Sequence, residues 1–336
     1  MRNRACREYQ HKPIAGAAAI LSVLVAWHGT AQAQSFPSKQ ITIVVPFAAG
    51  GPSDTMARLI ADGMGQQVGA RVLVENMAGA GGRTGSARVA KAEPDGHTLV
   101  FGNIGTHAAN VGLFKALAYD PVTDFEPVAL VANVPLVLSV RTGHPAKSFT
   151  EFAALAQAKP GEFTYASAGV GSASHLGCLL LDVALAAKAR HVPYRGAGPA
   201  LNDLVAGQID FMCDQTVTMM PQIAGGTIRP LATLSAKRIA ALPDLPTVAE
   251  QGVAGVTVDV WNGLFAPKGT PGPRVEQVST MVRKALVEPT VGQRLADLGG
   301  VVPTAEEGSP AALKALVSAE VTRWRDALKA AGVAGE

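Results

Sequence analysis

The chain has 336 residues, with 29 basic and 26 acidic side chains, and 48% of its residues are hydrophobic. Its first 33 residues resemble a secretory signal, because four basic residues, an apolar stretch at 14–27 and the small-residue cleavage site Ala31-Gln32-Ala33 follow one another. Removal of this segment leaves 303 residues (336 − 33) with 25 basic (29 − 4) and 25 acidic (26 − 1, Glu8) side chains, a balance that argues against a nucleic-acid-binding or polybasic membrane surface.

The apolar stretch of the signal is too short to cross a bilayer, which takes roughly 20 apolar residues, and no later run reaches that length. We therefore expect a soluble, exported protein. A mature chain of about 300 residues exceeds what one hydrophobic core usually supports. Since no linker or fixed-period repeat divides the sequence, we expect two interwoven lobes.

Residues 41–54 read as a buried strand that ends at Pro46, a turn of small residues, and the start of an amphipathic helix. Gly50 and Gly51 let the backbone approach a ligand, and Pro52 suits the first helical position. The free N–H groups of a helix start and the positive end of its dipole favour an anion. The alternative is an ordinary solvated turn between a strand and a helix.

A second strand is predicted at 71–75, followed by a glycine-dense segment at 79–85 and a short helix that ends near residue 92. A third strand at 98–102 leads into a loop of small and polar residues at 103–107. The alternation of strand and helix predicts a parallel sheet with right-handed crossovers. Ligands of such sheets lie outside the carboxyl ends of the strands, where these loops gather.

The second half repeats this pattern and ends in helices. The expected elements are a crossover strand at 128–140, a helix opened by the capping box Ser148–Glu151, strands at 162–167, 191–194, 209–214 and 228–234, helices after 175 and 199, a second crossover at 256–265, and final helices from 275 and from Ser309-Pro310. Small residues at 168–175 again join a strand to a helix. Two helix-start loops in different lobes suit a clamp around a small carboxylate, with hydroxyl contacts from Ser53, Thr106, Ser167 and Ser172.

Enzymatic readings have weaker support. The run Gly169-Val170-Gly171-Ser172 opens like a dinucleotide fingerprint but lacks the third glycine and the later acid. Ser172 and His175, on adjacent turns, leave a periplasmic serine hydrolase as the alternative function. No His, Cys or carboxylate cluster has zinc spacing, so we expect no metal. Because these enzymatic readings are weak, we also expect no cofactor and no catalytic residue.

Two cysteines remain after the signal, which takes Cys6 with it. Disulfides can persist in a compartment to which proteins are exported, so Cys178 and Cys213 are predicted to be bridged. Two separate buried thiols are the alternative.

Several motifs resemble the Bug family, the periplasmic binding proteins of tripartite tricarboxylate transporters. They cover essentially the whole mature chain in order: residues 43–54 (IVVPFAAGGPSD), 94–99 (PDGHTL), 165–176 (YASAGVGSASHL), 191–196 (HVPYRG) and 245–250 (LPTVAE). This resemblance implies a two-lobed α/β periplasmic binding protein, type II-like, each lobe a mainly parallel sheet flanked by helices, joined by two crossover strands. The expected boundaries are 34–135 with 258–336 for lobe 1 and 136–257 for lobe 2.

The resemblance also implies the function: capture of a small organic acid for uptake by the membrane permease subunits or for reporting to a sensor, by a monomeric protein that is not an enzyme and binds no nucleic acid. In the family, backbone groups of two glycine-rich loops and water hold one ligand carboxylate. Where the family often has an aromatic-Asp-Asn run, this chain has Met212-Cys213-Asp214-Gln215, so Asp214 alone carries over. The predicted ligand-binding residues are Phe47, Ala49, Gly50, Gly51, Ser53, Asp54, Thr106, Ser167, Gly169, Gly171, Ser172, Ala173, His175, Gly196 and Asp214.

Overall fold

A computed structural model describes residues 36–333 and 335 of the chain. The predicted signal sequence at 1–33 lies outside the described residues. Within the described part, no helix combines the length and the apolar character that crossing a membrane requires.

The first sheet is built around the opening strand of the mature chain. Its strand order is β2 (Leu73–Asn76), β1 (Thr42–Val45), β3 (Thr98–Asn103), β9 (Asp259–Pro267) and β4 (Phe125–Arg141). β1 pairs in parallel with β2 and β3, whereas β9 runs antiparallel to β3 and β4. β1 is apolar and almost wholly buried, as expected of a parallel strand with helices over both faces.

The second sheet repeats the arrangement. Here β5 (Thr164–Ser167) lies between β6 (Arg190–Pro193) and β7 (Phe211–Gln215), parallel to both. β4 lies antiparallel to β7 and to β8 (Ile228–Thr233). Each sheet therefore has three parallel strands, and antiparallel strands pair with this set along one of its edges.

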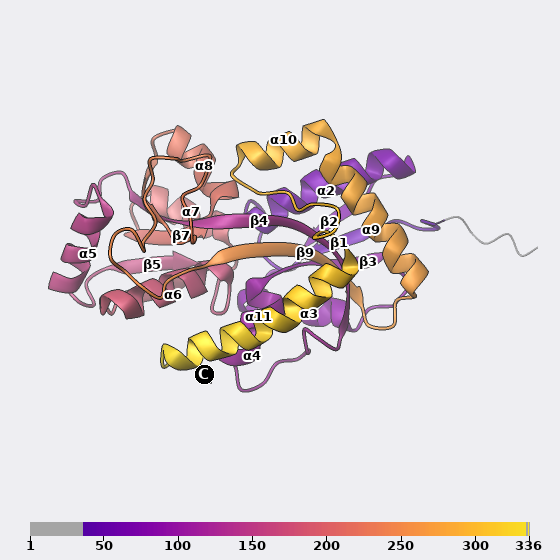
Figure 1. Ribbon diagram of the computed structural model, residues 1–336, viewed down its shortest axis with the longest axis horizontal. Coiled ribbons are helices and arrows are strands. Elements are labelled where there is room, and N and C mark those ends of the chain that lie inside the picture. The colour runs from indigo at the N-terminus through magenta and orange to yellow at the C-terminus, as the bar shows by residue number, and fades with distance from the viewer. Residues whose placement is uncertain (1–35, 334, 336) are drawn as a thin grey trace, which may run out of the picture. The chain divides into compact units, whose positions relative to one another are not determined.

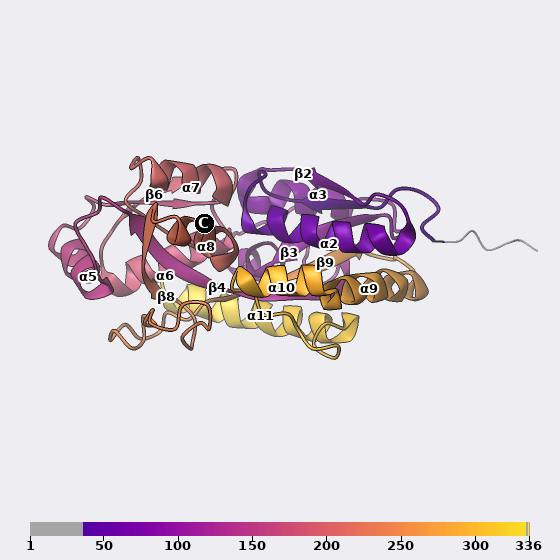
Figure 2. The ribbon, with the colours of Figure 1, turned by 90° about the horizontal axis from the view of Figure 1, so that it is seen from above.

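Two segments connect the sheets (Figures 1 and 2). β4 pairs with β9 over its first eleven residues, up to Pro135, and with β7 and β8 over residues 136–141. The chain returns at Val258, whose N–H donates to Leu234 O beyond β8 (2.9 Å), and enters β9. The predicted α/β fold with two crossover strands is confirmed.

Helices cover the faces of both sheets. The described helices are α2 (Pro52–Val68), α3 (Arg83–Ala90), α4 (Asn110–Leu113), α5 (Phe149–Ala158), α6 (Ala173–Leu185), α7 (Ala197–Val205), α8 (Thr216–Ala224), α9 (Gly272–Val287), α10 (Pro289–Asp297) and α11 (Pro310–Ala330). α9 packs against α2, and α11 packs across β4 and α4 with Trp324 buried beneath it. The capping predictions hold: Ser148 Oγ accepts from Glu151 N–H, and Ser309 Oγ accepts from Ala312 N–H.

One predicted loop is wrong. Residues 103–107 were expected to expose small and polar groups, but Gly105–Ala109 form a helical turn that runs directly into α4 and is buried. Asn103 starts this turn, because its Oδ1 accepts from the N–H groups of Gly105 (3.0 Å) and Thr106 (3.4 Å). An asparagine that caps a helical turn in this way is easily mistaken for a loop residue.

Candidate functional site

The first loop of the site joins β1 to α2. Gly51 is the N-cap of α2 and Pro52 occupies the first turn. Two N–H groups of the loop are already bonded: Ala48 donates to Arg195 O (3.0 Å), and Gly50 donates to Asp54 Oδ2 (3.0 Å). Within the described residues, the N–H groups of Gly51, Ser53 and Asp54 have no hydrogen-bond acceptor. These amides, at the positive end of the helix dipole, are the ones available to an anion.

Asp54 holds this loop in shape. Its carboxylate accepts from Gly50 N–H, from Arg58 Nε (3.1 Å) and from Asn76 Nδ2 (2.9 Å), and Asn76 also donates to Phe47 O (3.1 Å). Burial opposes the charge of Asp54, but the hydrogen bonds from Arg58, Gly50 and Asn76 hold its pKa below the ordinary value. The Asp54 carboxylate is thus bonded to other groups of the protein, and it holds the backbone of the loop in position.

Replacement of Asp54 by Asn is expected to lower the free energy of unfolding at pH 7 by about 1 to 2 kcal/mol, because the charged bonds to half-exposed Arg58 are lost. A carboxyl with a depressed pKa stabilises the fold above its ordinary pKa, and this contribution disappears as the pH falls through the lowered one. Urea unfolding of the native protein and the Asp54→Asn variant should therefore differ at pH 7, keep that difference down to about pH 3.8, the ordinary value, and converge only as the pH falls through the lowered pKa. A constant difference would contradict this role.

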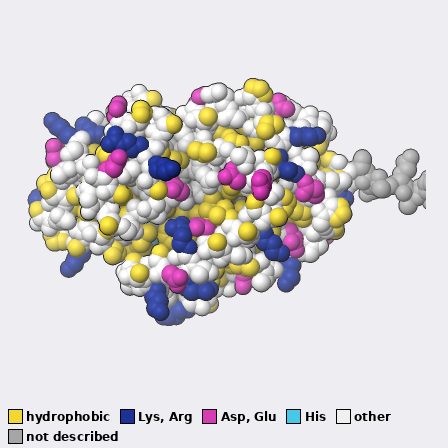
Figure 3. Space-filling model, viewed as in Figure 1, with side chains coloured by type: hydrophobic (Ala, Val, Ile, Leu, Met, Phe, Trp, Pro, Cys, Tyr) yellow, Lys and Arg dark blue, Asp and Glu magenta, His cyan; other side chains and the backbone are white. Residues whose placement is uncertain are grey.

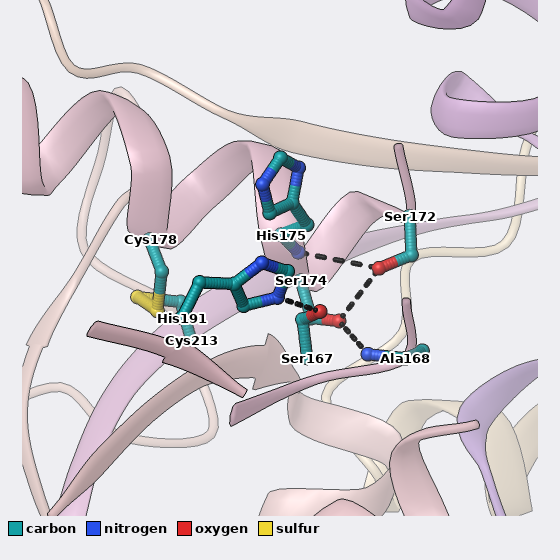
Figure 4. The surroundings of a disulfide bond; sticks show 8 residues. All are labelled: Ser167, Ala168, Ser172, Ser174, His175, Cys178, His191 and Cys213. Atoms are coloured by element: carbon teal, nitrogen blue, oxygen red, sulfur yellow. Dashed lines mark hydrogen bonds between the residues drawn. A yellow bond between two sulfur atoms is a disulfide. The ribbon is translucent and has the colours of Figure 1, made fainter. Parts of the chain in front are cut away.

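The second loop joins β5 to α6 and satisfies most of its own N–H groups, and Figure 4 shows the bond from Ala168 to Ser174. Ala168 N–H donates to Ser174 Oγ (2.9 Å), Gly169 N–H to Ser167 Oγ (3.0 Å) and Gly171 N–H to His175 Nδ1 (3.2 Å). Ser172 is the N-cap of α6, and its Oγ accepts from His175 N–H (3.3 Å). Among described residues, the N–H groups of Ala173 and Ser174 at the start of α6 are left without an acceptor.

Two histidines lie behind this loop. The ring centroids of His175 and His191 are 4.4 Å apart, and Ser167 Oγ lies 2.6 Å from His191 Nε2. Burial, with the neighbouring His191, lowers the pKa of His175 to about 3, and burial lowers that of His191 to about 4. Both rings are neutral at physiological pH and support the loop.

The hydrolase arrangement is not formed. Ser172 Oγ bonds the backbone N–H of His175 and Ser174 Oγ, while the His175 ring accepts from Gly171 N–H. Ser167 and His191 also form a close pair, but they do not serve as a nucleophile and base for a bound substrate. Ser167 is completely buried and lies outside the cavity described below.

Helix starts from both sheets meet at one cavity. Its empty volume is about 310 Å³, including open solvent at its mouth, and it is lined by Phe47, Gly51, Pro52, Ser53, Asp54, Asn103, Ala168, Ser172, Ala173, Ser174, Ala197, Asp214 and Gln215. The first residues or N-caps of α2, α6, α7 and α8 are among them. No lining residue is Lys, Arg or His, so backbone amides and helix dipoles supply the positive potential.

The loops of the two sheets touch around this cavity. Besides the hydrogen bond from Ala48 to Arg195, glycines allow very close backbone approach. A Cβ added to Gly81 would lie 1.9 Å from Val170 O, and one added to Gly105 would lie 2.5 Å from Gly171 O. The structure therefore has the two halves shut against each other.

Seven predicted site residues line the cavity: Phe47, Gly51, Ser53, Asp54, Ser172, Ala173 and Asp214. Eight do not: Ala49, Gly50, Thr106, Ser167, Gly169, Gly171, His175 and Gly196. Most of the second group shape or support the loops from behind. Thr106 is buried, with its Oγ1 bonded to Asn103 N–H (3.1 Å) and next to His107 Nδ1 (2.9 Å).

Six lining residues escaped prediction: Pro52, Asn103, Ala168, Ser174, Ala197 and Gln215. All lie within two positions of a predicted residue or inside a segment already identified. The sequence marks the loops well, but it does not tell which side of each loop faces the ligand.

Two ionisable residues line the cavity: Asp54 is paired with Arg58, whereas Asp214 has no ion pair among the described residues. It is 2% exposed, and its Oδ2 accepts from Thr218 Oγ1 (2.7 Å). Burial raises the pKa of Asp214 to about 7, although hydrogen bonds from Thr218 and from Gln215 N–H oppose the rise.

A disulfide joins Cys178 of α6 to Cys213 of β7, with Cα atoms 5.4 Å apart (Figure 4). Cys213 directly precedes Asp214, and Cys178 lies just over one turn into α6. The bond therefore fixes the helix start that supplies Ala173 and Ser174 against the strand that supplies Asp214.

We expect replacement of Cys178 by Ala to destabilise the protein by about 4 kcal/mol, because the crosslink spans 35 residues of chain. Calorimetry should show a melting temperature lower by roughly 6 °C. Dithiothreitol should lower that of the native protein similarly and leave the variant unchanged. Two titratable thiols in the native, non-reduced protein would contradict the bridge.

Comparison with known proteins places this site in context. Residues 56–333 match the family described as "Tripartite tricarboxylate transporter family receptor". The chain is 45% identical to MatC of Rhodopseudomonas palustris with bound malate (TM-score 0.85), covering 87% of this chain and 100% of that one. It is 39% identical to the periplasmic binding protein BugD (TM-score 0.86; 90% and 100% covered) and 36% identical to R. palustris Rpa4515 with adipate (TM-score 0.84; 90% and 100% covered).

Proposed function

This chain belongs to the tripartite tricarboxylate transporter receptor family, and from this premise we propose that it is a periplasmic binding protein that captures a small organic acid between two lobes. The solved relatives with malate and adipate support a carboxylate as the ligand. Their family supports a binding role without catalysis, in which the filled protein meets permease subunits or a sensor.

One observation carries the proposal: unpaired amides from α2 and α6, on different sheets, line the same cavity. A carboxylate accepts charge-assisted hydrogen bonds from N–H groups, each contributing roughly 1.5 to 3 kcal/mol. Three or four such bonds supply much of the roughly 8 kcal/mol of micromolar binding after ordering costs. We assign the carboxylate to the amides of Ser53, Asp54, Ala173 and Ser174.

We further propose that the ligand closes the two lobes. We place the lobe boundaries at 135–136 and 257–258, because β4 leaves β9 for β7 at the first position and the chain returns toward β9 at the second. Bending at these two crossings would separate α2 from α6 and open the cavity. A ligand that contacts both helix starts favours the closed state, because only that state offers both sets of amides.

A thermal-shift screen of the mature protein tests the proposal. The panel comprises malate, adipate, citrate, glutamate and benzoate, each matched with its neutral amide. At least one acid should raise the melting temperature, since a ligand specific to the folded state stabilises it, and its amide should not. If no acid raises it, or if the amides act equally, the proposed function is wrong.

Surface charge agrees with a small-molecule role. On the face in Figure 3, basic and acidic side chains are interspersed and form no large patch of one sign. We therefore place recognition of the organic acid in the cavity, where the described lining holds no basic side chain.

A further inference from the structure

The cavity has two chemically different walls. One consists of the starts of α2 and α6, where uncapped amides favour negative charge. The other includes the end of β7, where Asp214 and Gln215 lie beside Asn103 of β3 in the cavity lining. A carboxyl on this second wall is unexpected in a site for anions, because an ionised Asp214 would repel a second ligand carboxylate.

Resting on the proposed function, we propose that Asp214 binds the ligand as an uncharged carboxylic acid, so that the protein takes up an organic dianion together with one proton. The proton removes the repulsion and lets the second wall accept an oxygen-rich ligand group, carboxylate or hydroxyl. Asp214 is then a specificity residue that selects di-acids and hydroxy acids over ligands with an ammonium group.

The hydrogen bonds around Asp214 accommodate this proton. Thr218 Oγ1 lies 2.7 Å from Asp214 Oδ2 and 3.1 Å from Gln215 O. A hydroxyl has one proton and can donate fully to only one of these acceptors. If Thr218 donates to the Gln215 carbonyl, a proton on Asp214 can complete the shorter contact by donating to Thr218 Oγ1.

The neighbouring amides provide donors for ligand oxygens. Asn262 Nδ2 donates to Gln215 Oε1 (2.9 Å), which orients the Gln215 amide and leaves its Nε2 without an acceptor among the described residues. Asn103 Oδ1 is occupied by the N–H groups of Gly105 and Thr106, and its Nδ2 likewise has no acceptor there. Amide donors of this kind favour oxygen atoms and offer little to an ammonium group.

No charged group close to Asp214 replaces the proton. Ionisable residues of the elements packed against β7 are Glu126 and Arg141 on β4, Tyr165 on β5, His175 and Asp182 on α6, and Asp203 on α7; α8 carries none, and Asp54 on α2 faces the same cavity.

Of these groups, Arg141 lies far from Asp214 along β4, and His175 and Asp54 each keep one charge state near neutral pH. Arg141 lies four residues along β4 from Val137, the partner of Asp214, or roughly 13 Å. The His175 ring is neutral because burial and His191 lower its pKa to about 3, and Asp54 stays ionised against Arg58. Burial raises the pKa of Asp214 itself to about 7, which makes its proton available in the physiological range.

Carbon-13 NMR on the ligand-free mature protein gives a test that needs no ligand. With [¹³C]aspartate labelling, the Asp214 carboxyl signal is identified by its absence in an Asp214→Asn variant. We expect its titration midpoint near pH 7. A midpoint below pH 5 would overturn the inference and leave the proposed function untouched.

Calorimetry tests the coupling to binding, with the acid of the panel that gives the largest thermal shift. Between pH 6.5 and 8.5 the dissociation constant should rise about 25-fold, because binding requires a protonated Asp214 and the protonated fraction falls by that factor over this range. Binding at pH 8.5 should take up a proton, visible as a heat that varies with the ionisation enthalpy of the buffer. The Asp214→Asn variant, which is uncharged at every pH, should bind with a constant affinity and no proton uptake.

Asp259→Asn provides the matched control, because it removes the same charge from an exposed position at the start of β9 and should behave as the native protein does. An unchanged pH slope in Asp214→Asn, or a flat profile in the native protein, would overturn the inference. So would a best ligand that carries an ammonium group and loses affinity in Asp214→Asn. Absence of binding by every acid would instead refute the proposed function, and the inference with it.

Discussion

Replacement of Gly105 by Ala should weaken binding of the organic acid by about 100-fold or more, because the added methyl group keeps the helical turn after β3 away from the loop before α6. Its Cβ would lie 2.5 Å from Gly171 O and 3.2 Å from Ala173 N. Carbon atoms do not approach a carbonyl oxygen so closely, so α6 must retreat from α2. Loss of two charge-assisted hydrogen bonds at roughly 1.5 to 3 kcal/mol each accounts for the effect.

The ligand-free protein should tolerate this change. Opening of the lobes relieves the clash, so the melting temperature without ligand should stay within a few degrees of the native value. Gly272→Ala is the matched control, since nothing lies within 4 Å of an added Cβ there and neither glycine has a positive φ. Isothermal titration calorimetry gives the affinities, and full affinity in Gly105→Ala would refute closure by loop contact.

A second glycine pair repeats the test at positions with positive φ. Gly81 (φ +64°) would place a Cβ 1.9 Å from Val170 O, whereas Gly252 (φ +85°) has open space around it. Alanine strains the backbone similarly at both sites. Only Gly81→Ala should lose affinity.

Replacement of Ala173 by Pro is expected to weaken binding roughly 10- to 150-fold by removing one amide proton from the site. Ala173 is the first residue of α6, where proline fits the helix and the lost N–H has no acceptor within the fold. The preceding Ser172 has φ −72° and ψ 160°, a conformation that proline favours in its neighbour. Ser309-Pro310 at the start of α11 shows the same capped arrangement in this chain.

Its control is Gly272→Pro at the first residue of α9, far along the chain from the cavity lining. Both variants should retain the native melting temperature without ligand. Ala173→Pro should lose affinity and Gly272→Pro should keep it. Equal affinity in the two would show that this amide does not hold the ligand.

The sequence predicted the fold because each rule acted locally. Pro46 ends β1, small residues turn the chain, and apolar spacing defines α2, so each unit of strand, loop and helix could be identified alone. The sheets are less parallel than expected. The strands of the crossovers pair antiparallel, β9 with β3 and β4, and β4 with β7.

The site was only partly predictable because glycine marks a loop without showing where its amides point. Gly50 and Gly171 seemed the natural ligand contacts, but their N–H groups bond Asp54 and His175. The side chains that accept these bonds lie four residues downstream, inside the helices. This pairing leaves Ser53, three positions after Gly50, and Ala173, two positions after Gly171, to face the cavity.

Asp214 illustrates the opposite limit. Its position at the end of a strand was evident from the sequence, but its surroundings depend on tertiary packing. Burial, which outweighs the hydrogen bonds from Thr218 and Gln215, raises its pKa to about 7, and no cation lines the cavity. The ordinary pKa of an aspartate gives no hint of this.

A crystal structure of the mature protein with the best acid of the panel tests the central claim most directly. A ligand carboxylate should lie within hydrogen-bond distance, roughly 3 Å, of amide nitrogens from both Ser53 or Asp54 and Ala173 or Ser174. A carboxylate bound by side-chain cations elsewhere, or touching amides of one helix start alone, would contradict the account.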